Sequence, residues 1–318
     1  MIGSIIAALG NIGACLSLNS IPMLLASRAI AGVGAGLVGA GGRAKVARLP
    51  NPEKIYGYSG VAPCVFAFLA FFLVPYLIAL TGHATGMFAL QGLVAVVNIG
   101  VMIVERDRMN AYILFEQGAT SVEEEHPHEE IPVVHERLGV ITGGAIVLAA
   151  VLLGFQDIVV WEFSGLIANV SGVDLDQFRY VLMITAIIVI PASVIAGMLA
   201  DRFGLFWPLL AGLLVLVLST LVMVTDPGPS QFLTGHYARI FVGTFVGPLF
   251  LSLCARLNPT GGLVAASGAF TSIGMSLAPL VGSMLITNET RDFLMLGLVA
   301  CSAIGIILLC TMPLAINY

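Results

Sequence analysis

The stretch Gly197-Met198-Leu199-Ala200-Asp201-Arg202-Phe203-Gly204 places an acid and a base side by side between two glycines. An apolar run at 180–200 precedes this charged pair, and a second run at 205–224 follows it. Each run can cross a bilayer as a helix, which takes roughly 20 apolar residues. A charge at the bilayer centre costs about 3 kcal/mol or more. We therefore expect the charged pair to lie in a tight turn at the membrane surface, where the second glycine lets the next helix start.

The composition is that of a membrane protein along the whole chain. Of 318 residues, 58% are hydrophobic and 10% are charged, and the mean hydropathy is +1.03, whereas soluble domains carry about 25% charged residues. We expect an all-α membrane protein with about ten transmembrane helices. The predicted spans cover approximately 2–18, 22–42, 56–80, 85–104, 138–168, 180–200, 205–224, 237–255, 262–286 and 293–313. Within the first span, Gly3, Gly10 and Gly13 are predicted close-packing positions.

The basic residues set the orientation of these spans, because cytoplasmic loops are enriched in Lys and Arg. If the second span ends in the cytoplasm, only Arg179 and Arg291 face outside. The cytoplasmic residues are then Arg43, Lys45, Arg48, Lys54, Arg106, Arg108, Arg137, Arg202 and Arg256. This topology predicts a multi-pass protein of the plasma (inner) membrane whose C-terminus is cytoplasmic.

Two segments repeat each other in the same orientation. Arg28-Ala29-Ile30-Ala31-Gly32, with Gly36, matches Arg239-Ile240-Phe241-Val242-Gly243, with Gly247. Each copy leads into an Ala-Arg-Leu phrase followed by Asn-Pro, at 47–52 and at 255–259. A parallel repeat predicts two related bundles, each with its own copy. The alternative is a chance alignment of glycines, which are common in membrane helices.

The octapeptide at 197–204 resembles the loop signature G-x-L-A-D-R-x-G of the major facilitator superfamily of secondary transporters. The pattern R-x-x-x-G-x-G-x-G from Arg28 is similar to the fourth-helix motif of that family. The resemblance implies two six-helix bundles that rock about a central site. It also implies a role for Arg28 in proton coupling, and a cytoplasmic gate formed by Gly197, Asp201, Arg202 and Gly204.

The second half supplies six predicted spans and the first half four, so the chain is similar to the family from the family's third helix onward. A late start, a truncated gene and a true ten-helix protein remain alternatives. We predict an N-terminal bundle at 1–108, an acidic cytoplasmic linker at 109–137 and a C-terminal six-helix bundle at 138–318. The linker contains Glu123-Glu124-Glu125-His126-Pro127-His128. We interpret it as a solvated hinge rather than a metal site, because like charges repel.

Polar residues within spans are the candidates for solute binding or ion coupling, because their burial needs a reason. Arg28 either serves coupling or extends its charge to the outer interface. Arg239, its copy, lies nearer the predicted start of its helix, which favours the interface there. Gln91 and Asn98 share one helix face and either line the cavity or join neighbouring helices.

A polar cluster also interrupts the fifth span, where Gln156, Asp157, Trp161 and Glu162 fall within seven residues. Asp157 and Trp161 share a helix face. Two acids beside an aromatic ring suit proton uptake, or the binding of a cationic or polar solute, because burial raises a carboxylate pKa towards neutrality. The alternative is that the helix ends early and these residues form a wet outer loop.

Together these features predict a secondary active transporter that moves a small solute by alternating access and is coupled to an ion, with H+ as the candidate; symport is the expected mode, and antiport and uniport stay open. We expect no enzyme activity, no cofactor, no metal and no nucleic-acid partner, and the oligomeric state stays open. One alternative is a non-transporting truncated relative. A second is an intramembrane serine protease using Gly57-Tyr58-Ser59-Gly60. That enzyme needs a membrane-buried histidine as base, and we expect no histidine within a span.

Overall fold

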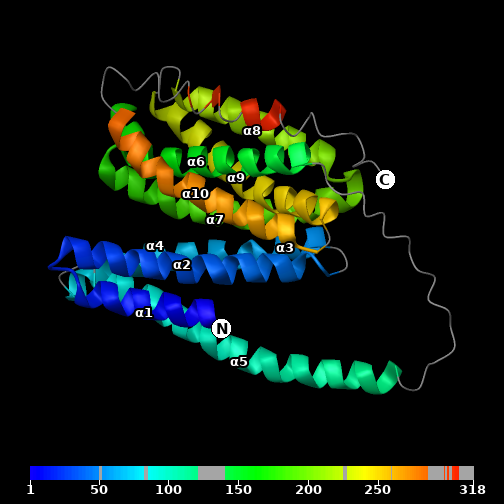
Figure 1. Ribbon diagram of the computed structural model, residues 1–318. Coiled ribbons are helices and arrows are strands. Elements are labelled where there is room, and N and C mark those ends of the chain that lie inside the picture. The colour runs from blue at the N-terminus through cyan, green and yellow to red at the C-terminus, as the bar shows by residue number, and fades with distance from the viewer. Residues whose placement is uncertain are drawn as a thin grey trace. The chain divides into compact units, whose positions relative to one another are not determined.

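The structure is a computed structural model, and every regular element in its described part is an α-helix (Figure 1). It describes residues 1–49, 52–81, 85–120, 140–224, 228–258, 260–285, 297, 299–300 and 303–307. The helices are α1 (Ile2–Leu16), α2 (Ile21–Val46), α3 (Pro52–Ser59), α4 (Val61–Thr81), α5 (Thr85–Thr120), α6 (Val140–Val170), α7 (Leu175–Phe203), α8 (Phe206–Val224), α9 (Pro229–Leu257) and α10 (Gly262–Leu285).

Seven segments of the described chain are helical, long and apolar enough to cross a membrane, and they coincide with predicted spans. They are Ile21–Val46, Lys54–Thr81, Thr85–Val104, Thr142–Val170, Asp176–Phe203, Phe206–Met223 and Pro229–Leu257. The predicted spans at 2–18 and 262–286 are shorter apolar helices, Ile2–Leu16 and Gly262–Ala278. Most of the predicted span at 293–313 lies outside the described residues, as does most of the acidic linker with its histidines. The prediction of an all-α membrane fold is confirmed.

Three local details differ from the predictions. Helix α5 continues through the charged residues after Val104 to Thr120. Helix α9 starts at Pro229 instead of Tyr237, because a proline in the first turn is pre-organised for a helix. The pair Asp201 and Arg202 lies in the last turn of α7, and the chain turns at Gly204, whose φ of +73° favours glycine.

By its contacts the chain divides into two units. The first comprises Met1–Gly39 and Val74–Arg137, and the second comprises Ala40–Leu73 and Leu138–Tyr318. The predicted boundaries at 108 and 138 follow the spans and the repeat rather than these contacts, and they stay a prediction.

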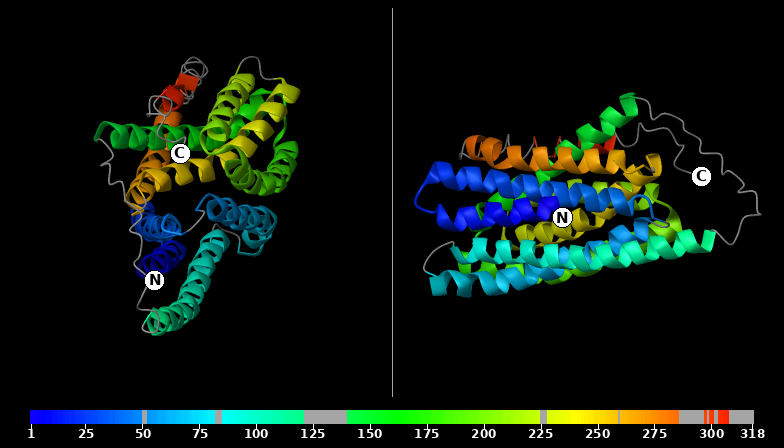
Figure 2. Two further views of the ribbon diagram at one scale, coloured as in Figure 1. Left: turned by 90° about the vertical axis from the view of Figure 1, so that its right-hand side faces the viewer. Right: turned by 60° about the horizontal axis from the view of Figure 1, so that its bottom comes forward.

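Small residues hold α1 against α2 in the first unit, as predicted for three glycines. A Cβ added to Gly10 would lie 2.7 Å from Ala31 Cα, and one on Gly13 would lie 2.8 Å from Ser27 Oγ. A Cβ on Gly3 would lie 2.8 Å from Gly34 O. Ala7 and Ala8 pack with Ala95 between α1 and α5. Figures 1 and 2 show the resulting arrangement, with α1 beside both α2 and α5.

The glycine motif after Arg28 therefore yields a stability prediction. A Cβ on Gly34 would meet the backbone of Ala7, whereas a Cβ on Gly32 meets nothing within 4 Å. We expect Gly34→Val to lower the free energy of unfolding by about 1–3 kcal/mol, because backbone atoms must move apart. Gly32→Val, the matched control, keeps nearly the parental stability. Thermal unfolding in detergent micelles measures both, and equal losses would contradict the close contact of α1 and α2.

In the second unit α10 lies against α6, and α9 packs between α7 and α8 (Figures 1 and 2). The helix α3 packs on α7 and α9. The largest buried cluster joins these helices and includes Ile146, Ala196, Leu213 and Leu249. A second cluster surrounds Phe178 and Phe232. This packing places one face of α6, with the predicted polar residues, beside α9 and α10.

Candidate functional site

Arg28 lies two turns into α2, and its guanidinium contacts two other helices. Nη1 donates hydrogen bonds to Asn11 Oδ1 on α1 and to Gln91 Oε1 on α5, both at 2.8 Å. The guanidinium also stacks over the Phe88 ring on α5, with Cζ 5.3 Å from the ring centroid, a favourable cation–π distance. These contacts favour an Arg28 side chain that points towards the neighbouring helices α1 and α5 over one that extends to the membrane interface.

The sequence indicated only one of these partners, Gln91. Asn98, its predicted companion, is half-buried two turns further along α5, and no contact in the described part of the chain joins it to Arg28. Asn11 and Phe88 were missed. Asn11 is the only amide side chain in the first predicted span, and it is buried, with its Nδ2 donating to Ala7 O at 2.9 Å. That single amide in an apolar run was a usable signal.

Arg239 on α9 is completely buried and pairs with α6. Its Nη1 lies 3.3 Å from Asp157 Oδ1, and its Nη2 donates to Gln156 O at 3.0 Å. Its Nε has no hydrogen-bond partner in the described residues. The interfacial interpretation of Arg239 is wrong. Because α9 starts at Pro229, the arginine lies three turns inside the helix, where desolvation makes a paired carboxylate necessary.

The helix α6 continues to Val170, so the alternative of a wet outer loop is also wrong. Gln156 is 1% exposed, while the Asp157 side chain is 46% exposed. Trp161 is half-buried one turn after Asp157, and Glu162 is exposed. The structure thus brings Gln156 and Asp157 to Arg239. It does not bring Glu162 there.

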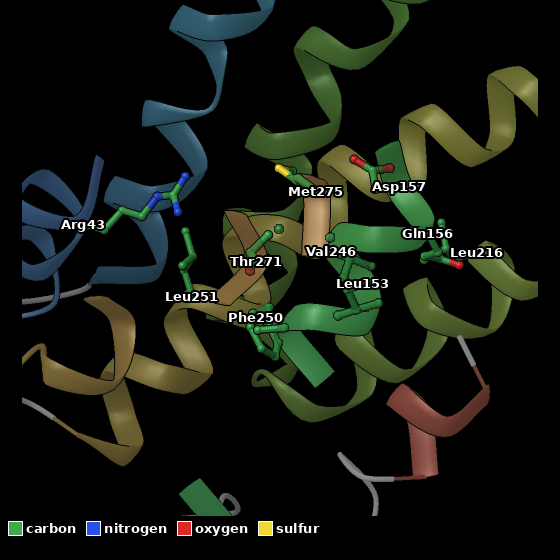
Figure 3. A pocket seen from close by; sticks show the side chains of 14 residues that line it. Arg43, Leu153, Gln156, Asp157, Leu216, Val246, Phe250, Leu251, Thr271 and Met275 are labelled. Carbon is green, nitrogen blue, oxygen red and sulfur yellow. The ribbon is translucent and has the colours of Figure 1, made fainter. Parts of the chain in front are cut away.

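A cavity of about 190 Å³ opens beside the ion pair. Its polar lining comes from Arg43, Gln156, Asp157 and Thr271, and Figure 3 shows Arg43 and Asp157 on opposite sides. The remaining lining residues are glycines or apolar, namely Ala150, Leu153, Gly154, Leu216, Gly243, Val246, Gly247, Phe250, Leu251 and Met275. A Cβ on Gly243 would lie 3.5 Å from Asp157 Oδ1, an ordinary contact distance, so α9 passes close to the carboxylate at this glycine. The cavity therefore combines an apolar wall with two charged side chains.

The predicted gate residues lie at the end of α7, beside α3. Gly197 and Asp201 line a small cavity with Lys54 and Tyr58 of α3. A Cβ on Gly57 would lie 2.8 Å from Ser193 O and 3.3 Å from Gly197 Cα, so the two helix backbones nearly touch. Arg202 is exposed and stacks over the Phe203 ring at 5.5 Å.

Among the described residues, His236 lies within a candidate span, contrary to our expectation. His236 on α9 is fully buried and stacks on Phe232, with ring centroids 5.4 Å apart. It is far from Ser59, whose Oγ donates to Tyr56 O. Tyr56 belongs to the buried cluster of Cys254, and the eighteen residues from His236 to Cys254 span about 27 Å of helix. A serine–histidine pair is therefore not formed.

Comparison with known proteins identifies the family. The family model described as Major Facilitator Superfamily matches residues 1–283. The chain belongs to the major facilitator superfamily. This membership confirms the resemblance carried by residues 197–204 and by the Arg28 motif. Members of the superfamily are secondary transporters, so the chain is a multi-pass membrane transporter and not an enzyme. No curated protein sequence matches it.

Solved structures of the superfamily share the fold. The chain is similar to the proton:xylose symporter XylE bound to 6-bromo-6-deoxy-D-glucose, with 17% identity, a TM-score of 0.71, and coverage of 98% of this chain and 78% of XylE. The E. coli fucose:proton symporter FucP gives 15% identity, a TM-score of 0.62, and coverage of 96% and 81%. The human organic anion transporter MFSD10 gives 16% identity, a TM-score of 0.68, and coverage of 96% and 77%.

Proposed function

We propose that this superfamily member is a secondary active transporter that moves a small solute by alternating access and couples the movement to protons at Asp157. The observation that carries the proposal is the ion pair of Asp157 with the fully buried Arg239, at the edge of a cavity. A half-exposed carboxylate can receive a proton from the cavity, while its partner cannot reach water.

Protonation of Asp157 would leave the guanidinium of Arg239 buried without its counter-charge. Removing one partner of a buried pair is strongly unfavourable, because the remaining charge is uncompensated. The protonated protein therefore favours a conformation in which Arg239 finds another partner or water. This preference links proton binding to the change between the conformation open to one side of the membrane and the conformation open to the other. A ligand, here the proton, shifts such an equilibrium by the difference between its affinities for the two conformations.

The other predicted residues have supporting roles in this proposal. Arg28, held by Asn11 and Gln91, anchors the polar site of the first bundle, with Asn98 on the same helix. Gln156 and Trp161 shape the polar site of the second bundle, and Glu162 lies at the outer rim of that site. Gly197, Asp201, Arg202 and Gly204 form the cytoplasmic gate. The bundles at 1–108 and 138–318, joined by a cytoplasmic linker at 109–137, rock in the plasma membrane with the C-terminus cytoplasmic.

Several structural neighbours support coupling to protons. XylE and FucP are described as proton symporters of xylose and fucose. MFSD10 is described as an organic anion transporter, so the shared fold is compatible with solutes of different charge.

A transport assay tests the coupling. The full chain is reconstituted in liposomes that contain a pH-sensitive dye, and solute panels of neutral sugars and impermeant organic anions are added outside. We expect one panel to drive protons inward. We expect Asp157→Asn to abolish this proton movement while solute exchange without a gradient continues, because an amide cannot carry the proton.

Asp176→Asn is the matched control, because Asp176 is exposed and pairs only with the nearby Arg179 in the described part. It should keep proton movement unchanged. Solute-driven proton entry that persists in Asp157→Asn would overturn the role of Asp157. Absence of proton movement with every solute would favour the non-transporting alternative.

A further inference from the structure

We propose that the solute is a small organic monoanion whose charged group binds Arg43. This inference rests on the proposed function and adds the chemical class of its solute. From the positive-inside rule alone, Arg43 is predicted only to lie at the cytoplasmic surface. In the structure the Arg43 side chain is exposed and also lines the cavity, opposite Asp157 (Figure 3).

The guanidinium of Arg43 is available for a ligand. No hydrogen bond or ion pair engages it in the described residues, and the Tyr56 hydroxyl donates only to the Arg43 backbone oxygen, at 2.7 Å. A Cβ on Gly268 would lie 2.7 Å from Arg43 Nη1, so the absence of a side chain there lets the guanidinium reach over α10. An arginine fork in this position matches the two oxygens of a carboxylate.

The charges around the cavity favour an anion. Arg43 and Asp157 are the only charged residues among those that line it, and Arg239 lies directly behind Asp157. Arg239 neutralises the Asp157 charge in their ion pair, so the positive charge of Arg43 is left without a counter-charge in the lining. A monoanion neutralises the site, whereas a cation would add to the positive charge.

The wall and the volume favour a compact apolar body on that anion. The apolar side chains of the lining include Leu153, Leu216, Val246, Phe250 and Met275. The cavity measures about 190 Å³, and a cavity of about 150 Å³ holds benzene. Benzoate and butyrate are therefore suitable probes, because each joins one carboxylate to an apolar group of this size.

The charge of the solute decides whether transport responds to membrane potential. One proton on Asp157 and one monoanion at Arg43 carry no net charge together. Transport is then electroneutral and does not respond to membrane potential. A neutral solute that moves with one proton would instead accumulate a further tenfold for each additional ~59 mV of membrane potential.

The first test measures binding to the purified full chain in detergent. The probe pairs are benzoate with benzamide and butyrate with butyramide, which differ in charge at nearly constant size. We expect the carboxylates to raise the thermal unfolding temperature. The Kd obtained from this shift should be at least about tenfold lower for a carboxylate than for its amide, because the carboxylate forms a charge-assisted hydrogen bond. Equal binding of amides and carboxylates, or binding of neither, would overturn the inference.

Two variants locate the binding group. Arg43→Gln should weaken benzoate binding roughly tenfold to hundredfold, and Arg43→Lys should retain part of it. Lys45→Gln is the matched control, because Lys45 is an exposed base in the same last turn of α2 and lies outside the cavity lining. It should change binding by less than about threefold. Full benzoate affinity in Arg43→Gln would contradict the role of Arg43.

The second test separates this inference from the proposed function. Benzenesulfonate, an anion that does not cross bilayers by itself, and D-xylose, a neutral sugar, are compared in the dye-loaded liposomes. We expect proton entry with benzenesulfonate only, and an unchanged rate under a valinomycin potential. Proton entry with D-xylose alone leaves the proposed function standing and overturns the anion. Carboxylate binding without any proton entry supports the anion site and overturns proton coupling.

Discussion

Asp157→Ala is expected to lower the free energy of unfolding by about 2 kcal/mol or more. The variant leaves the Arg239 guanidinium fully buried, with the Gln156 carbonyl as its only hydrogen-bond partner among the described residues. Breaking a buried pair costs about 3–5 kcal/mol, and we expect a smaller loss than this because the Asp157 side chain is 46% exposed. Denaturant unfolding in mixed micelles measures the loss.

A double-mutant cycle isolates the contribution of the pair. Arg239→Met removes the buried charge and fits the apolar surroundings, so its cost should be smaller than that of Asp157→Ala. The double variant should be at least as stable as Asp157→Ala alone, because replacement of a buried pair by apolar residues is often neutral. Strictly additive losses would show that the two side chains do not interact.

Gly274→Val is expected to be the most destabilising single change in the α6–α10 contact, at about 3 kcal/mol or more. A Cβ at Gly274 would meet Val151 O and would lie 2.9 Å from Phe155 N. These are backbone atoms, so one helix must move away, and overpacking of this kind costs about 1–3 kcal/mol even where side chains can adjust. The variant should also lose the binding cavity, since Gly154 and Thr271 line it from the same contact.

Gly144→Ala is the matched control for this substitution. Gly144 lies on α6, and a Cβ there meets nothing within 4 Å. Alanine should leave stability unchanged or raise it by about 0.5–1 kcal/mol, because glycine loses more backbone freedom on folding. Thermal unfolding and ligand binding are measured on both variants, and a tolerated Gly274→Val would refute the close contact of α6 with α10.

Helix positions were predictable because hydropathy reports directly on the lipid environment. The spans at 205–224 and 262–286 match α8 and α10 within a residue or two. Errors occurred where a local signal competed with hydropathy. Pro229 starts α9 ahead of its apolar part. The helix α5 continues through Glu105-Arg106-Asp107-Arg108, because Glu and Arg are good helix formers.

The polar sites were only partly predictable, because spacing along one helix does not show its neighbours. Asp157 and Arg239 were each recognised as unusual, but their pairing joins residues 82 apart. His236 lies one residue before the predicted span at 237–255, so no histidine was expected within a span, whereas α9 begins at Pro229 and includes it. Arg43 was counted as a surface charge by the positive-inside rule, although a side chain near a helix end can turn towards a cavity.

The helices α2 and α9 stop at the same distance from their arginines, eighteen residues after each (28 to 46, and 239 to 257). The two arginines therefore occupy matching positions relative to the ends of their helices, but they differ in what surrounds the cation. Arg28 contacts two carboxamides and a phenyl ring among the described residues, none of which titrates, whereas Arg239 contacts a carboxylate. Under the proposed proton coupling, only Arg239 has a partner that gains and loses its charge during transport, so the first unit holds a permanent charge and the second holds a proton-dependent ion pair.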